Sequence, residues 1–343
     1  MDDASVRSRL ERFLAARLGG DTRITSLERS TEGFSQETFS FEVEVAGQRR
    51  GYVAKREPAA GLLDPYDLEP EFRVLHALSD DPLPSPATPW FERDPAVLDR
   101  PFYVMERLPG EVPIPVAGPD GTGPFTDAER ATLGPDVARA LARLHAVDWR
   151  GRGLDFLEAP EAGRDAADRE LARWERRIAE SGFAPHPLVS ETLLWMRRNL
   201  PATDQLTLVH GDYRLGNLLV AREGGTARLT GILDWELVHV GDPIEDLGWC
   251  TSLLWRAGTP YASGLLEPEA FAAAYTEASG RPVDPERLRF YEILAIVKMA
   301  AIMLTGLAIF RDGRTDDLRL AIFDHQLPGL HLLLAMMRNL PVA

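Results

Sequence analysis

The spacing of hydrophobic and polar positions changes repeatedly within the first third of the chain. Apolar side chains recur at helical spacing up to Gly19-Gly20, then at every second residue, and later at helical spacing again. A short turn, Ala46-Gly47-Gln48, separates two alternating runs, as is typical of strands in a hairpin. The pattern predicts a helix, two strands, a helix and a buried strand at residues 5–18, 39–45, 50–55, 70–78 and 102–105.

Residues 106–110 resemble a hinge, and the pattern beyond them becomes mainly helical. Thr126-Asp-Ala-Glu129 fits a capping box, in which the two outer side chains bind backbone N–H groups at a helix start. Two short apolar runs, 206–209 and 229–233, predict strands of one functional hairpin within this helical part. We therefore expect an α+β fold with a small β-rich lobe, residues 1–107, and a larger helical lobe, residues 108–343.

The stretch from His210 to Asn217, followed by Asp234, carries the clearest chemistry. Asp212, Asn217 and Asp234 lie on two short loops that each leave one of the apolar runs. Two carboxylates and an amide at strand ends suit a site that deprotonates a hydroxyl and holds Mg²⁺ against a nucleotide, because Mg²⁺ prefers hard oxygen ligands. The alternative is a polar hairpin with Asx turns at both ends. The second predicted strand places Asp234 at its end, in register with the motif after the first strand, and this favours the functional interpretation.

Charge and cysteine content exclude several classes of protein. The formal charge of −15 over 343 residues argues against a nucleic-acid partner, which favours basic surfaces. One cysteine, Cys250, excludes an intramolecular disulfide framework, and the charged N-terminus shows no secretory signal, so we expect a cytoplasmic protein. The run 293–310 is almost continuously apolar but contains Lys298 and Gly306; we interpret it as a buried helix and expect no membrane partner.

The basic residues are almost all arginine, and the only lysines are Lys55 and Lys298. Lys55 stands at the end of a predicted strand that begins at Tyr52. A compact ammonium reaches phosphate oxygens as a point charge, which a planar guanidinium cannot replace. The use of lysine at this position supports a role in binding phosphate.

The chain resembles the aminoglycoside phosphotransferase (APH) family of kinase-like enzymes. It looks closest to the branch related to the phosphotransferase domains attached to some acyl-CoA dehydrogenases. Residues 208–219 and 231–248 carry the resemblance, and residues 71–75 and 103–110 support it. The likeness covers nearly the whole chain. It implies a two-lobed protein-kinase-like fold and ATP-dependent transfer of a phosphoryl group to a hydroxyl of a small molecule.

The resemblance also implies a role for each motif residue. Asp212 would orient the acceptor hydroxyl and accept its proton, while Asn217 and Asp234 would hold the Mg²⁺ that bridges the nucleotide phosphates. Lys55 would contact the α- and β-phosphates and pair with Glu71 on the small-lobe helix.

Further nucleotide contacts follow from the resemblance with one departure from the protein-kinase pattern. Backbone groups near Glu106 and Leu108 would bind the adenine edge. Only Gly33 is present where protein kinases carry three glycines, although Gly33, Ser35 and Gln36 could still donate backbone or side-chain hydrogen bonds to phosphate. Arg214 lies where related loops carry a cation near the transferred phosphate, so we expect it to offset developing negative charge.

Three residues near the motif are expected to be structural. His210 should brace the loop by hydrogen bonding, and His145, on an apolar helical face, should be a core histidine with satisfied nitrogens. The resemblance implies that Asp246 anchors the catalytic loop from the start of the next helix.

The acceptor and several alternatives stay open. The acyl-CoA-dehydrogenase branch suggests a hydroxyacyl acceptor, whereas the acidic balance would suit an aminoglycoside; GTP could replace ATP. A nucleotide-binding pseudokinase is the alternative from another class, and the presence of Lys55, Asp212, Asn217 and Asp234 argues against it. A two-metal phosphoesterase would need more His and Asp ligands than lie near these carboxylates.

Overall fold

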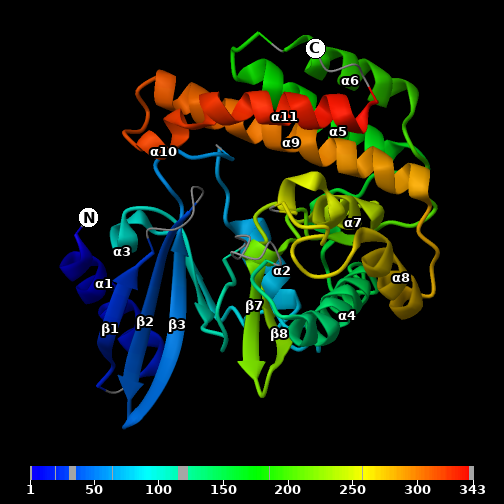
Figure 1. Ribbon diagram of the computed structural model, residues 1–343. Helices are drawn as coiled ribbons and strands as arrows, with labels where there is room; N and C mark the ends of the chain where they lie inside the picture. The colour runs from blue at the N-terminus through cyan, green and yellow to red at the C-terminus, as the bar shows by residue number, and fades with distance from the viewer. Residues whose placement is uncertain are drawn as a thin grey trace. The chain divides into compact units, whose positions relative to one another are not determined.

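The computed structural model describes residues 2–19, 21–30, 36–63, 65–114, 123–184, 186–256 and 258–339 (Figure 1). The chain forms two compact units, Met1–Pro109 (unit 1) and Gly110–Ala343 (unit 2). The expected boundary after residue 107 lies two residues before this division. Unit 1 contains a sheet and unit 2 is mainly helical, so the expected α+β class is confirmed.

Unit 1 is built on a five-stranded antiparallel sheet with the strand order β1-β2-β3-β5-β4. Its elements are α1 (Asp3–Leu18), β1 (Arg23–Arg29), β2 (Glu37–Val45), β3 (Gln48–Arg56), α2 (Glu69–Ala77), β4 (Trp90–Glu92), α3 (Pro95–Leu98) and β5 (Phe102–Glu106). The hydrophobic pattern missed the two edge strands. In β1 only Ile24 is buried, and β4 has three half-buried residues, so neither shows a clear alternation.

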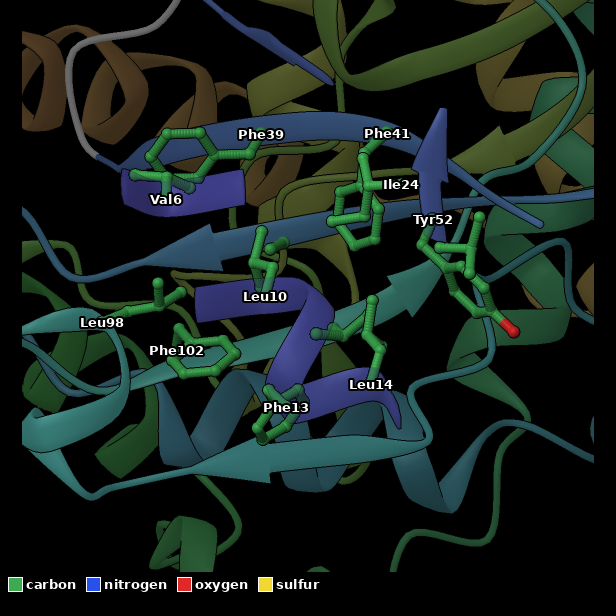
Figure 2. Close-up of a cluster of buried hydrophobic side chains, with 13 residues drawn as sticks. Val6, Leu10, Phe13, Leu14, Ile24, Phe39, Phe41, Tyr52, Leu98 and Phe102 are labelled. Atoms are coloured by element: carbon green, nitrogen blue, oxygen red, sulfur yellow. The ribbon is translucent and has the colours of Figure 1, made fainter. Parts of the chain in front are cut away.

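Helix α1 packs on the sheet through one apolar face (Figure 2). The Asp2 side chain accepts a hydrogen bond from the Ser5 N–H at 2.8 Å and caps the helix, which ends at Gly19 with a φ of +72°. The buried side chains of this face and of the sheet include Val6, Leu10, Phe13, Leu14, Ile24, Phe39, Phe41, Tyr52 and Phe102. Burial of each such side chain stabilises the fold by about 1.5–3 kcal/mol.

The β2–β3 hairpin fixes the position of Lys55. Ala46 and Gly47 both have positive φ, 51° and 74°, as a two-residue turn of the primed type requires. The resulting register places Lys55 opposite Thr38 on β2 and opposite Tyr103 on β5. Lys55 therefore belongs to the central strand of the sheet.

Unit 2 is organised around the long helix α9. The helices of unit 2 are α4 (Asp127–His145), α5 (Asp165–Glu180), α6 (Pro187–Arg198), α7 (Ile244–Thr251), α8 (Pro268–Ser279), α9 (Pro285–Arg311), α10 (Leu318–Ala321) and α11 (Phe323–Met337), with 3-10 turns at Asp155–Leu157, Leu215–Asn217 and Leu253–Trp255. Helices α5, α7, α10 and α11 pack against α9, and α5, α9 and α11 are seen together in Figure 1. The capping box at Thr126 and Glu129 is present at the start of α4, as predicted.

Two segments of unit 2 are long and apolar enough to cross a membrane by length and composition, Pro285–Arg311 and Leu318–Met337. The protein itself buries 67% of the most apolar window of the first segment and 33% of that of the second. The first segment is α9, and it has the burial of a core helix, as the sequence predicted for residues 293–310.

The four strands of unit 2 form two separate antiparallel pairs. Strand β6 (Thr207–Val209) pairs with β9 (His239–Gly241), and β7 (Leu218–Glu223) pairs with β8 (Thr226–Ile232). The expected hairpin between the runs 206–209 and 229–233 is therefore wrong. The turn at Gly224-Gly225 gives β8 a partner that is adjacent in the chain, and this local pairing prevails.

Candidate functional site

The loop that leaves β6 is anchored through its backbone by Asp246, in the first turn of α7. The N–H groups of His210 and Gly211 donate to the two carboxylate oxygens of Asp246, both at 2.8 Å. Burial alone would raise the pKa of Asp246, but the hydrogen bond and charge of His145 outweigh it and lower the pKa. His145 also contacts the Tyr275 hydroxyl at 2.8 Å, so both of its ring nitrogens are engaged. The structural roles expected for Asp246 and His145 are confirmed.

Gly211 permits a close approach that another residue could not make. Its φ is +81°, and a Cβ atom there would lie 2.6 Å from the Leu237 carbonyl oxygen. The Gly211 carbonyl accepts a hydrogen bond from Lys298 Nζ. The backbone of this residue is thus held on both sides, by Asp246 at its N–H and by Lys298 at its carbonyl.

His210 joins the loop to the end of β8. Its Nδ1 accepts from the Asp212 N–H at 3.1 Å, and its Nε2 lies 3.0 Å from the Leu233 carbonyl oxygen. Burial lowers the pKa of His210, which favours the neutral ring with a proton on Nε2. The expected bracing role of His210 is confirmed.

Three donors fix the Asp212 carboxylate. Oδ1 accepts from the Trp249 indole N–H at 2.6 Å and from Arg214 Nε at 3.0 Å, while Oδ2 accepts from Asn217 Nδ2 at 2.6 Å. These bonds occupy both lone pairs of Oδ1 and one of Oδ2. No further donor to Oδ2 is recorded among the described residues, which leaves one lone pair to accept a proton from a hydroxyl group.

Asn217 and Asp234 stand at neighbouring ends of the β7–β8 pair. The amide nitrogen of Asn217 also donates to the Asp212 carbonyl at 2.9 Å, which turns its Oδ1 away; no donor to this oxygen is recorded among the described residues. The Leu233 N–H donates to the Asn217 carbonyl at 2.8 Å, and Asp234 follows directly with a left-handed φ of +66°. An amide oxygen and a carboxylate in adjacent positions fit the donor set of Mg²⁺.

Arg214 lies beside the same carboxylate. Its guanidinium carbon is 4.4 Å from the centroid of the Trp255 ring, and the Trp255 and Trp249 rings are 5.3 Å apart. Within the described part of the chain, no hydrogen bond from the two terminal nitrogens of Arg214 is recorded. The side chain is therefore oriented by Nε and could use its other nitrogens to bind an anion.

In unit 1 Lys55 and Glu71 form an ion pair between β3 and α2. Lys55 Nζ lies 2.9 Å from Glu71 Oε1, and both side chains are buried. The amide of Gln36 donates to the other Glu71 oxygen at 2.9 Å. The expected pair is present, and its contact with phosphate stays a prediction.

The structure describes Glu106 and Leu108 among the remaining residues that were predicted to contact the nucleotide. Gly33 and Ser35 lie outside the described residues. The N–H of Glu106, the last residue of β5, is used by the Ala87 carbonyl at 2.8 Å. Leu108 is half-buried, and its N–H has no partner recorded in the ranges that the structure describes. A contact with adenine through these groups stays a prediction.

A family model, the phosphotransferase enzyme family (APH), matches residues 26–291. The chain belongs to this family. Among curated relatives, Probable acyl-CoA dehydrogenase IBR3 of Arabidopsis thaliana is 29% identical over 295 residues, which is 79% of this chain and 34% of that protein. Acyl-CoA dehydrogenase family member 11 of Gallus gallus is 29% identical over 313 residues, 85% of this chain and 38% of that protein. This APH-family chain thus spans little more than a third of these relatives.

Solved structures of APH-family proteins have the same fold. A Ralstonia eutropha protein classed with the aminoglycoside phosphotransferases superposes with a TM-score of 0.76 at 24% identity, covering 97% of this chain and 98% of that one. A type I macrolide 2'-phosphotransferase gives a TM-score of 0.60 at 23% identity, covering 95% and 98%. The expected kinase-like architecture is confirmed.

The structure adds residues to the site that the motif search did not single out. Trp249 lies one helical turn past Asp246 and binds Asp212, and Lys298 reaches the same loop from α9. The rarity of lysine in this chain was the one sequence signal that could have marked Lys298. No sequence signal marked Trp249, because a tryptophan within an apolar helix is as typical of a hydrophobic core as of a functional site.

Proposed function

We propose that this protein transfers the γ-phosphoryl group of ATP to a hydroxyl group of a small molecule. The observation that carries the proposal is the Asp212 carboxylate, which three donors orient while one lone pair of Oδ2 has no donor within the described ranges. Membership of the APH family supports the same reaction class. GTP is the alternative donor, and a pseudokinase without turnover is the alternative from another class.

In the proposed reaction Asp212 acts on the acceptor. Its Oδ2 accepts a hydrogen bond from the acceptor hydroxyl and takes the proton as the new bond from the acceptor oxygen to the γ-phosphorus forms. The bond from the γ-phosphorus to the bridging oxygen breaks, and ADP leaves with that electron pair. Positioning provides most of the catalysis, since the transferred group needs little covalent help from the protein.

Asn217 and Asp234 would hold Mg²⁺ in this proposal. The bound ion would neutralise negative charge on the nucleotide phosphates. Arg214 would add positive charge near the transferred group through its terminal nitrogens. On unit 1, Lys55, held by Glu71, would contact the α- and β-phosphates, and the sequence around Gly33 and Ser35 and the backbone of Glu106 and Leu108 would add contacts to phosphate and adenine.

For the acceptor we propose a hydroxyacyl compound. Two observations support it: the curated relatives are named as acyl-CoA dehydrogenases, and a guanidinium and two indole rings lie beside Asp212. A polycationic acceptor would meet the positive charge of Arg214, whereas an acyl group can pack on the half-buried Trp255 ring and a carboxylate or thioester carbonyl can bind the guanidinium. An aminoglycoside is the alternative, because family members named for such substrates share the fold.

A coupled ADP-release assay tests the proposal. The panel contains hydroxyacyl-CoAs, free hydroxy acids, aminoglycosides, macrolides, choline and simple sugars, each with Mg-ATP and Mg-GTP. We expect turnover with a hydroxyacyl compound, and a loss of about 10²- to 10⁴-fold in kcat for Asp212→Asn. Binding of ATP without turnover of any acceptor would favour the pseudokinase; full turnover by Asp212→Asn or Asp234→Ala would contradict the assigned site.

A further inference from the structure

Lys298 is buried beneath the catalytic loop, inside a helix of apolar sequence. Its side chain is 3% exposed, and its ammonium donates to the Gly211 carbonyl and lies 3.8 Å from Glu245 Oε1. The ammonium also lies 4.6 Å from the centroid of the Trp249 ring and 5.2 Å from that of Trp174. A buried ammonium is costly unless it is paired and hydrogen-bonded, so this environment is specific.

The Glu245 carboxylate beside the ammonium belongs to a cluster with His239 and Glu170. His239 Nδ1 lies 2.9 Å from the Leu237 carbonyl oxygen, and its Nε2 lies 3.1 Å from Glu245 Oε2 and 4.0 Å from Glu170 Oε2. Burial alone would lower the pKa of His239, but the two carboxylates outweigh it and raise the pKa to about 9. Burial and the neighbouring Glu170 raise the pKa of Glu245, while Arg173, 3.6 Å from Glu170, adds a further cation to the cluster.

The same three side chains could in principle be metal ligands. One ligand atom from each of Glu170, His239 and Glu245 lies within 4.8 Å of the others. Both nitrogens of His239, however, face oxygen acceptors and carry or share protons, so neither offers a lone pair to a metal. Lys298 already supplies a cation to the cluster. We therefore interpret the cluster as an ionic network centred on the ammonium.

Trp249 connects this network to the reacting group. The face of its ring receives the Lys298 ammonium, and its N–H donates to Asp212 Oδ1 at 2.6 Å. Two paths thus lead from Lys298 to Asp212, one through the Gly211 carbonyl and one through the indole. Rotation of the indole would move the donor that sets the direction of the carboxylate, and a misplacement of about 1 Å can cost about 10²-fold in rate.

We propose that Lys298 is a positioning residue for Asp212, which it acts on through the Gly211 carbonyl and the Trp249 indole. The proposal rests on the proposed function, because it assigns Asp212 the acceptor hydroxyl. It assigns Lys298 a role that is separate from nucleotide binding, which is the role proposed for Lys55. Lys298 touches no reacting atom and acts only by fixing the loop and the direction of the carboxylate.

Two variants test the proposal, and a third is their matched control. Lys298→Met removes the ammonium, and Trp249→Phe keeps a ring over Lys298 but removes the N–H that reaches Asp212. Trp174→Phe is the control, because its indole N–H donates to Glu170 at 2.5 Å on the same network and does not reach Asp212. If Lys298→Met does not fold, the double variant Lys298→Met/Glu245→Gln removes one positive and one negative charge together and carries the same measurements.

Kinetics should separate positioning from general damage. We expect Trp249→Phe and Lys298→Met to lower kcat by about tenfold or more with the KM for ATP changed less than about twofold, while Trp174→Phe retains most of its kcat. Equal losses in Trp249→Phe and Trp174→Phe, or an unchanged kcat in folded Lys298→Met, would overturn the proposal.

A spectroscopic measurement decides the inference even where no acceptor is found. The ¹H–¹⁵N indole resonance of Trp249, assigned through its loss in Trp249→Phe, should move in both Asp212→Asn and Lys298→Met. A resonance that moves in Asp212→Asn and stays in place in Lys298→Met would contradict the proposal. A wild-type protein without turnover, but with the expected shifts, would contradict the proposed function alone. A stoichiometric metal in the purified protein that Glu245→Gln removes would also overturn the positioning role.

Discussion

The two lysines of this chain show two different uses of a buried ammonium. Lys55 pairs with the Glu71 carboxylate and so links strand β3 to helix α2. Lys298 lies between α5, α7, β9 and the catalytic loop and faces two carboxylates, a carbonyl and two indole rings. The Lys55–Glu71 pair links two elements of unit 1, whereas the Lys298 network joins several elements of unit 2. The Lys55–Glu71 pair therefore suits contact with a ligand, and the Lys298 network suits holding a reacting group in a fixed position.

The largest difference between the two lysines should appear in stability. Lys298→Met would remove a buried ammonium and leave the buried carboxylates of Glu170 and Glu245 with the partly exposed cations of His239 and Arg173, so we expect a loss of about 3–5 kcal/mol in the free energy of unfolding of unit 2. Lys55→Met should cost less, because Glu71 keeps the donor of Gln36. Urea unfolding followed by circular dichroism and tryptophan fluorescence measures both losses.

A charge-matched control sharpens this expectation. Lys298→Met/Glu245→Gln removes one charge of each sign and should recover part of the lost stability, since no additional carboxylate is left without a cation. Equal losses for the two single lysine variants would show that the network is no more important than the pair.

The parts of the fold with regular hydrophobic spacing could be predicted from sequence. Helix α1, the β2–β3 hairpin and the capping box of α4 each follow from local pattern and turn chemistry. The pairing of β6 with β9 could not be predicted, because both strands have three residues and the pairing is set by distant packing. Edge strands β1 and β4 lack a buried face and gave no periodic signal.

The site could be predicted only where a motif is contiguous. Asp212, Asn217 and Arg214 lie within six residues, and the structure joins them by hydrogen bonds. Trp249 and Lys298 lie 37 and 86 residues beyond Asp212, on helices whose sequences indicate a core. Their contact with the loop depends on how α7 and α9 pack, which no short-range pattern records.

In nucleotide binding the larger effect should come from Lys55, whereas in stability it should come from Lys298. We expect Lys55→Met to raise the KM for ATP and to lower kcat/KM by about 10²-fold, because it removes a charge that binds phosphate. Lys298→Met should leave the KM for ATP within about twofold. Steady-state kinetics and the thermal shift produced by Mg-ATP check both values. A raised KM in Lys298→Met, with an unchanged KM in Lys55→Met, would reverse the proposed division of roles.

Gly211 tests how tightly the loop is held from its two sides. We expect Gly211→Ala to cost about 2–3 kcal/mol, because its φ of +81° disfavours a side chain and the added Cβ would lie 2.6 Å from the Leu237 carbonyl oxygen. Gly224→Ala is the matched control: its φ is +58°, but no atom lies within 4 Å of the added Cβ, so only about 1 kcal/mol should be lost. Similar losses at both positions would mean that the loop can move away from Leu237, contrary to anchoring by Lys298 and Asp246.

The smallest predicted effect is a pH dependence of the stability that the Lys298 network provides. His239 faces Glu245, Glu170, the Leu237 carbonyl and, farther away, Lys298 and Arg173. Because its pKa is raised from 6.5 to about 9 in the folded protein, its contribution to stability is complete below pH 6.5 and is lost as the pH rises to about 9. The slope cannot exceed about 1.4 kcal/mol per pH unit for one proton. Urea unfolding of unit 2 between pH 6 and about 9.5 should therefore show a decline, which His239→Gln should flatten and Lys55→Met should preserve. An equal decline in His239→Gln would assign the pH dependence to another group and remove His239 from the charge balance that holds Lys298.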